Sequence, residues 1–71
     1  MKIKYDPDVD AAYISFKEGI IQVTTIRITE NMSIDFGPHE EIAGIEILDA
    51  SEHLNIVKES PKIELENLIP A

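Results

Sequence analysis

Turn-forming residues recur at short intervals along this chain, and between them apolar and polar residues alternate. The clearest case is residues 32–36, where Met32, Ile34 and Phe36 alternate with two polar residues. A period of two puts the apolar side chains on one face of a strand and the polar ones on the other. Short alternating segments between regular turn signals are typical of antiparallel hairpins, so the chain is predicted to fold as a β-meander.

Strands are expected at residues 2–5, 11–16, 21–28, 32–36 and 42–48. The third of these segments contains a break in phase. Ile21 and Val23 fit one alternation. Ile26 and Ile28 fit the opposite one. Because a one-residue slip would move half of these side chains to the solvent face, a β-bulge or bend is predicted near residues 24–25.

A short helix is predicted after the fifth strand. Asp49 and Glu52 have the spacing of a capping box, in which the first residue caps the helix and the second reaches back to it. The apolar pattern continues this helix over residues 50–58. Its expected buried face consists of Ala50, Leu54 and Val57.

These elements together predict one small α+β domain with an antiparallel sheet of four to five strands. The sheet occupies residues 1–49, the helix residues 50–58 and a C-terminal tail residues 59–71. The tail fits two interpretations. Ile63 and Leu65 alternate like a strand, whereas Leu68 and Ile69 join Leu65 in a helical turn. In either form these apolar residues are expected to be buried, against the sheet or against a partner subunit.

Size and composition favour a small protein that associates with itself. A chain of 71 residues without cysteine forms one domain with a thin core and no disulfide. Self-association is one way for such a chain to gain stability, so a homo-oligomer is expected. No apolar run approaches the roughly 18 residues of a membrane span, and the first residues lack the apolar segment of a signal peptide. A cytoplasmic protein that does not bind membranes is therefore expected.

The charge is acidic and unevenly distributed. The net charge is −8, of which residues 37–71 carry six units and residues 1–36 carry two. Proteins that bind nucleic acid or anionic membranes need a basic surface, so both partners are excluded. A basic protein partner or a cation remains compatible with this charge.

The acidic second half also supplies the candidate partner-binding residues. Glu46, Asp49 and Glu52 could steer a basic protein toward the fifth strand and the helix. Leu65 and Leu68 in the tail could then be buried against it. The alternative interpretation of the acidic residues is a solvated surface that keeps the protein soluble.

Asp6, Asp8 and Asp10 form an alternating cluster of carboxylates, which is a weak candidate for a metal site. Calcium binds carboxylates that converge from alternate residues of a tight loop. A calcium loop of the EF-hand type would also need glycine and glutamate where this chain has Ala11 and Lys17. Turn capping is therefore the favoured role of the three aspartates, and no cofactor is predicted.

The two histidines do not point to catalysis. His39 follows a turn proline beside two glutamates, and His53 lies in the predicted helix. Neither has a cysteine, a third ligand or a nucleophile close to it in the sequence. Both are expected to be exposed, and no catalytic residue is predicted.

Two phrases of the sequence resemble a known family. Residues 5–14, Tyr-Asp-Pro-Asp-Val-Asp-Ala-Ala-Tyr-Ile, are similar to the opening of domain-of-unknown-function family 2283, a group of small uncharacterised prokaryotic proteins. Residues 44–51, Gly-Ile-Glu-Ile-Leu-Asp-Ala-Ser, resemble the end of that family's sheet. The resemblance covers about residues 2–51 and departs from the family pattern at Ala12, where leucine or valine is usual. Within the second phrase, Gly44 at mid-strand predicts a kink or the close approach of another backbone.

The resemblance implies a small β-rich domain with no established activity and no assigned catalytic residue. Some members are similar to products encoded beside small toxin-like proteins, which implies an antitoxin-like role. We therefore predict a non-enzymatic protein-binding module. The alternatives are a divalent-cation-binding protein that uses the three aspartates and a structural homo-oligomer without another partner.

Overall fold

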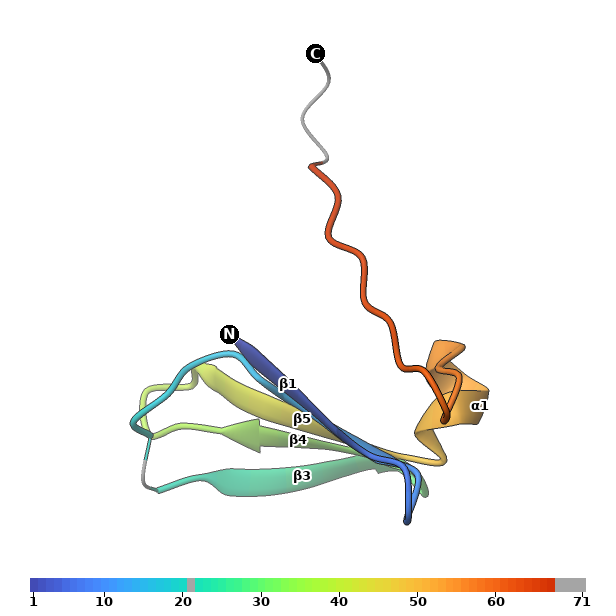
Figure 1. Cartoon of the computed structure of the whole chain (residues 1–71). Coiled ribbons are helices and arrows are strands. Elements are labelled where there is room, and N and C mark those ends of the chain that lie inside the picture. Colours follow the sequence, from blue (N-terminus) through green and yellow to red (C-terminus); the bar gives the residue numbers. More distant parts are fainter. Residues whose placement is uncertain (21, 68–71) are drawn as a thin grey trace.

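The computed structural model of this chain describes residues 1–20 and 22–67 (Figure 1). Its elements are β1 (Lys2–Asp6), β2 (Ala11–Ser15), β3 (Thr24–Thr29), β4 (Met32–Phe36), β5 (Ile42–Leu48) and α1 (Ala50–Leu54). The predicted class is confirmed, because the strands form one antiparallel sheet and are followed by one short helix. No helix in the described part of the chain is long and apolar enough to cross a membrane.

The order of strands in the sheet is β1-β2-β5-β4-β3. Strands β1 and β2 form one hairpin, and β3, β4 and β5 follow one another as a meander. The two units join because β5 pairs with β2, so β2 and β3 are neighbours in the sequence but not in the sheet. Strand β5 therefore lies at the centre, and β1 and β3 are the two edges.

The register gives the sheet one apolar and one polar face. A row of five isoleucines crosses all five strands in the order Ile3, Ile14, Ile45, Ile34 and Ile26. The adjacent row of the same face consists of Tyr5, Ala12, Ile47 and Met32. We call these nine residues the apolar face. The opposite face, which we call the polar face, also has two rows. The first row is Lys4, Tyr13, Glu46, Ser33 and Arg27, and the second row is Lys2, Ser15, Gly44, Asp35 and Thr25.

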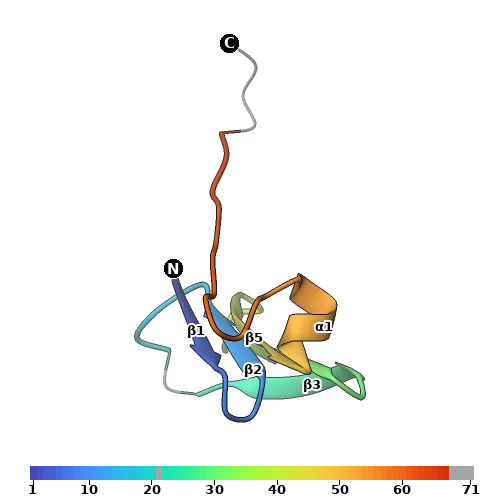
Figure 2. The same cartoon turned by 45° about the vertical axis from the view of Figure 1, so that its right-hand side comes forward.

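The core is small and lies at one end of the apolar face, where α1 packs on the sheet. It consists of Ala12, Ile47 and Ala50, with Tyr5 and Met32 among the half-buried residues around it. No large side chain of the described residues is fully buried. Helix α1 has only five residues, so it covers only part of the sheet. Figures 1 and 2 show that α1 and the tail lie on the same side of the sheet.

The helix is shorter than predicted and starts differently. It ends at Leu54 because Asn55 adopts the left-handed conformation, which asparagine tolerates better than most residues. The capping box is wrong, because Asp49 is also left-handed and its side chain makes no capping hydrogen bond. Of the predicted buried face only Ala50 is buried, since Leu54 and Val57 are both exposed.

The bulge in the third strand is also displaced from its predicted position. Thr24 and Thr25 pair regularly with β4, and the register shifts between Arg27 and Thr29 instead. The extra residue of the bulge therefore lies next to the β3–β4 turn, and Thr29 pairs with Met32 at the end of the β3–β4 hairpin. Strand β3 starts at Thr24 rather than residue 21, which lies outside the described residues.

The tail forms neither the strand nor the helical turn that its sequence allows. Residues 61–67 have no regular structure, and the chain leads away from the sheet in both Figure 1 and Figure 2. Ile63 is 62% exposed and Leu65 is 93% exposed. The predicted burial of these two side chains is therefore absent in the single chain. Residues 68 and 69 lie outside the described residues.

Candidate functional site

A hydrogen-bonded cluster on the polar face links three strands across β5. The Tyr13 hydroxyl donates to Asp35 Oδ2 at 2.7 Å, and the Thr25 hydroxyl donates to Asp35 Oδ1 at 2.6 Å. To reach Asp35 from β2, the Tyr13 ring passes over Gly44 of β5, where a Cβ atom would collide with the ring. The predicted approach of another backbone at Gly44 is wrong, because the group that approaches is the side chain of Tyr13.

The chemistry of this cluster is structural. The hydrogen bond to Asp35, together with burial, raises the pKa of Tyr13 to about 12. The phenol therefore stays protonated at neutral pH, and both oxygens of Asp35 already accept hydrogen bonds. A general acid or base needs a pKa near the working pH, so a phenol with a pKa of about 12 is not suited to proton transfer at neutral pH.

A second cluster, centred on Asp10, ties the β1–β2 turn to the start of α1. Asp10 Oδ1 accepts from the Tyr5 hydroxyl at 2.7 Å and from the Ser51 amide at 3.0 Å. Asp10 Oδ2 accepts from the Ser51 hydroxyl at 2.7 Å, and the Ala50 amide donates to the Asp10 carbonyl. Asp10 has a positive φ of 53°, which aspartate adopts more readily than most residues.

The titration of this second cluster follows from the same contacts. The hydrogen bonds from Tyr5 and Ser51 lower the pKa of Asp10. Burial, followed by the hydrogen bond to Asp10, raises the pKa of Tyr5 to about 12. Asp10 is therefore a charged acceptor that holds three donors at neutral pH, and its contacts stabilise the fold.

The three aspartates proposed as a weak metal site have separate roles. Asp6 Oδ1 accepts from the amide of Asp8 at 2.9 Å, so the turn-capping interpretation is confirmed for Asp6. Asp10 is engaged by Tyr5 and Ser51 as described above. Within residues 1–20 and 22–67, no three side chains of histidine, cysteine, aspartate or glutamate are placed to hold a metal ion.

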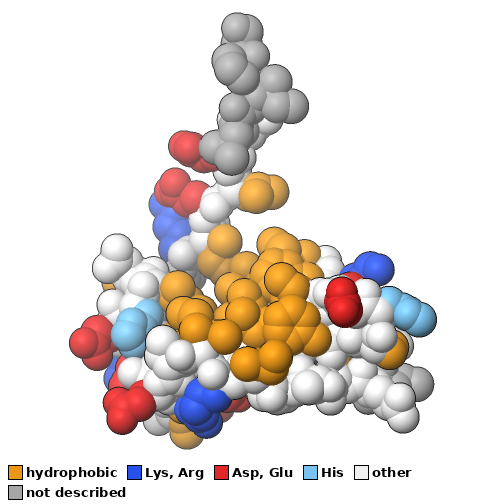
Figure 3. Space-filling view, turned by 180° about the vertical axis from the view of Figure 1, so that it is seen from behind, with side chains coloured by type: hydrophobic (Ala, Val, Ile, Leu, Met, Phe, Trp, Pro, Cys, Tyr) orange, Lys and Arg blue, Asp and Glu red, His pale blue; other side chains and the backbone are white. Residues whose placement is uncertain are grey.

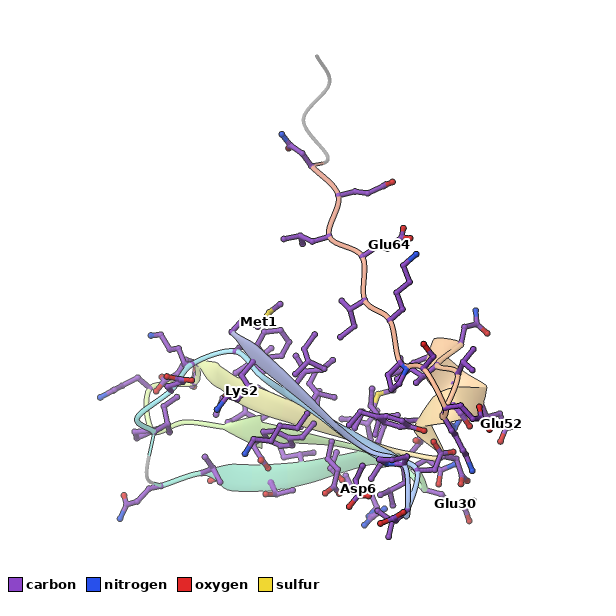
Figure 4. All side chains as sticks on the ribbon, viewed as in Figure 1. Met1, Lys2, Asp6, Glu30, Glu52 and Glu64 are labelled. Carbon is purple, nitrogen blue, oxygen red and sulfur yellow. The ribbon has the colours of Figure 1, made fainter. Side chains whose placement is uncertain are left out.

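The predicted partner-binding residues do not form one surface. Glu46 is exposed on the polar face of β5, whereas Asp49 and Glu52 are exposed at the start of α1. Figure 4 shows Glu52 on α1, and Leu65 belongs to the tail that leads away from the sheet. Leu68 lies outside the described residues.

Both histidines are exposed, as predicted. The His53 Nε2 atom lies 3.2 Å from the Asn31 side-chain nitrogen, a contact between α1 and the β3–β4 turn. The His39 amide donates to Glu41 Oε2 at 3.1 Å. The first contact joins α1 to the β3–β4 turn, and the second lies within the turn that precedes β5.

The most extensive candidate surface is the apolar face, which the sequence analysis did not single out as a site. Four of its five isoleucines are half-buried, and Ile26 on the edge strand is 47% exposed. Figure 3 shows hydrophobic side chains gathered in one continuous patch below the tail. Uninterrupted apolar patches on small proteins mark interaction surfaces. The alternation predicted which side chains share this face, but it could not show that α1 would cover so little of it.

The family model described as a protein of unknown function, DUF2283, matches residues 2–51. The chain belongs to this family. Searches of curated proteins and of solved structures found no match. The structure explains the two DUF2283 phrases physically, because each cluster joins one phrase to the other. Within the first phrase Tyr5 donates to Asp10, which also accepts from Ser51 of the second phrase. Tyr13 of the first phrase packs over Gly44 of the second.

Proposed function

We propose that this DUF2283 chain is a non-enzymatic protein-binding module that works as a homo-oligomer, and that a second copy covers its apolar face. The observation that carries the proposal is the isoleucine row, which crosses the whole sheet and contains no fully buried residue, since four of its members are half-buried and Ile26 is exposed. Two sheets that pack face to face lie about 10 Å apart and bury the side chains between them. A second copy would thus complete a core that one chain leaves half-formed.

The exposed area supports this proposal. The chain exposes 5838 Å², whereas a compact monomer of its mass of 8.0 kDa exposes roughly 4,500 Å². The outstretched tail, in which Leu65 is 93% exposed, and the partly covered apolar face both contribute to this exposed area. Both surfaces are available to a second copy.

The distribution of charge favours a second copy over a basic protein. The nine residues of the apolar face include no charged side chain, although the net charge of the chain is −8. Two copies can therefore meet at this face without placing like charges opposite each other, and an isologous contact needs only one patch. The acidic residues that would steer a basic partner, Glu46, Asp49 and Glu52, lie outside this face.

The proposal is tested with two substitutions at neighbouring positions of β3. Ile26→Glu puts a charge on the apolar face, and Arg27→Gln changes the net charge by the same amount on the polar face. Light scattering should give twice the chain mass for the unsubstituted chain and for Arg27→Gln, and the single-chain mass for Ile26→Glu. Circular dichroism should show that both variants keep the sheet. A single-chain mass for the unsubstituted protein at every concentration would refute the proposal.

A heterologous partner is the competing outcome. The tagged chain can be recovered from its own host at low and at high salt, and the proteins that elute with it identified by mass. A stoichiometric basic protein that is lost at high salt, together with a monomeric isolated chain, would replace self-association with the antitoxin-like form of partner binding.

A further inference from the structure

We propose that the tail of one copy adds as a sixth strand to the β1 edge of a second copy. The tail in this proposal is residues 61–67. The inference rests on the proposed function, because it requires a second copy on the apolar side of the sheet. It identifies a second contact between the copies, made by main-chain hydrogen bonds and by specific side-chain pairs.

Strand β1 is an open edge of the sheet. It pairs with β2 on one side, and no strand of the described residues pairs with it on the other. An edge strand presents unpaired N–H and C=O groups that can accept another strand. Adding an extended peptide to such an edge is a common mode of peptide recognition. The edge also carries Lys2 and Lys4, neither of which forms an ion pair within the described part of the chain.

The tail matches this edge in one antiparallel register. With Lys62 opposite Asp6, the pairs are Asp6–Lys62, Tyr5–Ile63, Lys4–Glu64, Ile3–Leu65 and Lys2–Glu66. Three of these pairs join opposite charges on the polar face, and two join apolar side chains on the apolar face. Each kind of cross-strand pair stabilises a sheet. The parallel arrangement over the same residues would place Lys62 opposite Lys2 and Glu66 opposite Asp6, which is unfavourable at both ends.

The other edge of the sheet fits the tail less well. Strand β3 carries one cation, Arg27, whose guanidinium donates to the Glu30 carbonyl at 2.7 Å. Two glutamates of the tail, Glu64 and Glu66, would then share one arginine. The β1 edge instead offers one lysine for each glutamate, so charge complementarity selects β1.

The described tail already has the alternation that a strand requires. Lys62 Nζ and Glu64 Oε1 are 3.1 Å apart, so the two charged side chains lie on the same side of the chain. Leu65 between the glutamates is 93% exposed. Pro61 precedes the paired residues, at a position that strands tolerate. Figure 4 shows Glu64 on the part of the tail that stands clear of the sheet.

The direction of the tail indicates pairing between chains. The tail leaves the molecule on the side of α1 and the apolar face, which is the side where the second copy lies (Figures 1 and 2). Residues 55–60 join α1 to the tail, and at about 3.3 Å per residue they span up to roughly 20 Å when extended. That length exceeds the separation of about 10 Å between two packed sheets. The paired residues of the tail can therefore reach the edge of the facing copy.

The absence of cysteine makes a cross-linking test direct. Residues opposite each other in antiparallel strands have Cα atoms about 4.5–5.5 Å apart, which is within the range of a disulfide. Full-length chains carrying Lys4→Cys are mixed with chains carrying Glu64→Cys and oxidised gently. We expect a covalent heterodimer from this mixture. The matched control replaces Glu64→Cys by Leu65→Cys, whose side chain points to the other face, and should lose the cross-link.

Two results would overturn the proposal. One is the lack of any Lys4→Cys to Glu64→Cys heterodimer. The other result concerns a chain that carries both Lys4→Cys and Glu64→Cys. If its cross-link forms only within one chain, the tail pairs with its own β1. The mass of the same chains under reducing conditions separates this failure from failure of the proposed function. Twice the chain mass without the cross-link refutes tail exchange alone, whereas a single-chain mass refutes both.

Discussion

Gly44 is a position where the structure predicts the effect of a single substitution on stability. Alanine in a strand is normally more stable than glycine by roughly 0.5–1 kcal/mol, because glycine loses more backbone freedom on folding. Here a Cβ atom at position 44 would collide with the hydroxyl group and ring of Tyr13. Gly44→Ala should therefore displace the ring and break its hydrogen bond to Asp35.

The cost of that displacement can be estimated from its parts. A hydrogen bond to a charged group contributes about 1.5–3 kcal/mol when buried, and less for this half-buried pair. Fitting an extra methyl group into a packed site costs about 1–3 kcal/mol. After the intrinsic gain of alanine is subtracted, we expect Gly44→Ala to destabilise the fold by about 1–4 kcal/mol. For a domain of this size, each kcal/mol lowers the Tm by roughly 4–8 °C.

A double-mutant cycle isolates the contact. Unfolding is followed by circular dichroism at one fixed protein concentration, since self-association shifts the Tm with concentration. Gly44→Ala should lower the Tm of the unsubstituted chain. In a Tyr13→Ala background, where the ring is absent, the same substitution should be neutral or stabilising. An equal effect in the two backgrounds would show that the ring does not determine the need for glycine.

Three further predictions concern the tyrosines and the Asp10 cluster. In an ultraviolet titration of the folded chain, both tyrosines should ionise with a pKa of about 12. Because phenols in the unfolded chain ionise near 10.0, the stability of the fold should decrease as the pH rises from about 10 to about 12. Normal ionisation near pH 10 in the folded chain would contradict the two hydrogen bonds. Because the pKa of Asp10 is lowered in the folded chain, ionised Asp10 stabilises the fold at pH values above its ordinary pKa of 3.8, and this stabilisation is lost as the pH falls through the lowered pKa. Asp10→Asn should therefore weaken the dependence of stability on acid pH. Ser51→Ala should lower the Tm because it removes the hydroxyl that donates to Asp10, whereas Ser60→Ala in the exposed turn should leave it unchanged.

The elements of this fold could be predicted because their cause is local. Alternation with period two identified the strands, and Met32 to Phe36 of β4 agrees with its prediction at both ends. The turn signals between the alternating segments marked where the strands stop. The turn role of Asp6 also followed from local chemistry, since its carboxylate accepts an amide only two residues away.

The remaining features depend on contacts between distant parts of the chain. That β5 lies between β2 and β4 follows from packing two separate units together, and alternation carries no information about it. Asp49 looks like a helix cap, but the Ala50 amide instead donates to the backbone of Asp10, which is far away in the sequence. The role of Gly44 depends on a ring from β2 that reaches Asp35 on β4.

The candidate sites also divide into features of single positions, which the sequence could predict, and features of the assembled fold, which it could not. The sequence identified acidic residues and tail leucines as binding residues, because charge and hydropathy are properties of single positions. The open apolar face is a property of the assembled sheet, and it depends on how few residues α1 has to cover it. The match between the tail and β1 likewise becomes visible only once β1 is known to be an edge.

The most direct test of a shared apolar face is an isotope-filtered NMR experiment. Chains with labelled isoleucine methyl groups are mixed with unlabelled chains, and contacts between the two kinds of chain are recorded. We predict intermolecular contacts from the methyl groups of Ile14, Ile45 and Ile34, at the centre of the isoleucine row. Absence of such contacts, together with strong broadening of the same methyl signals by a soluble paramagnetic probe, would show that the face is open to solvent and would contradict the account.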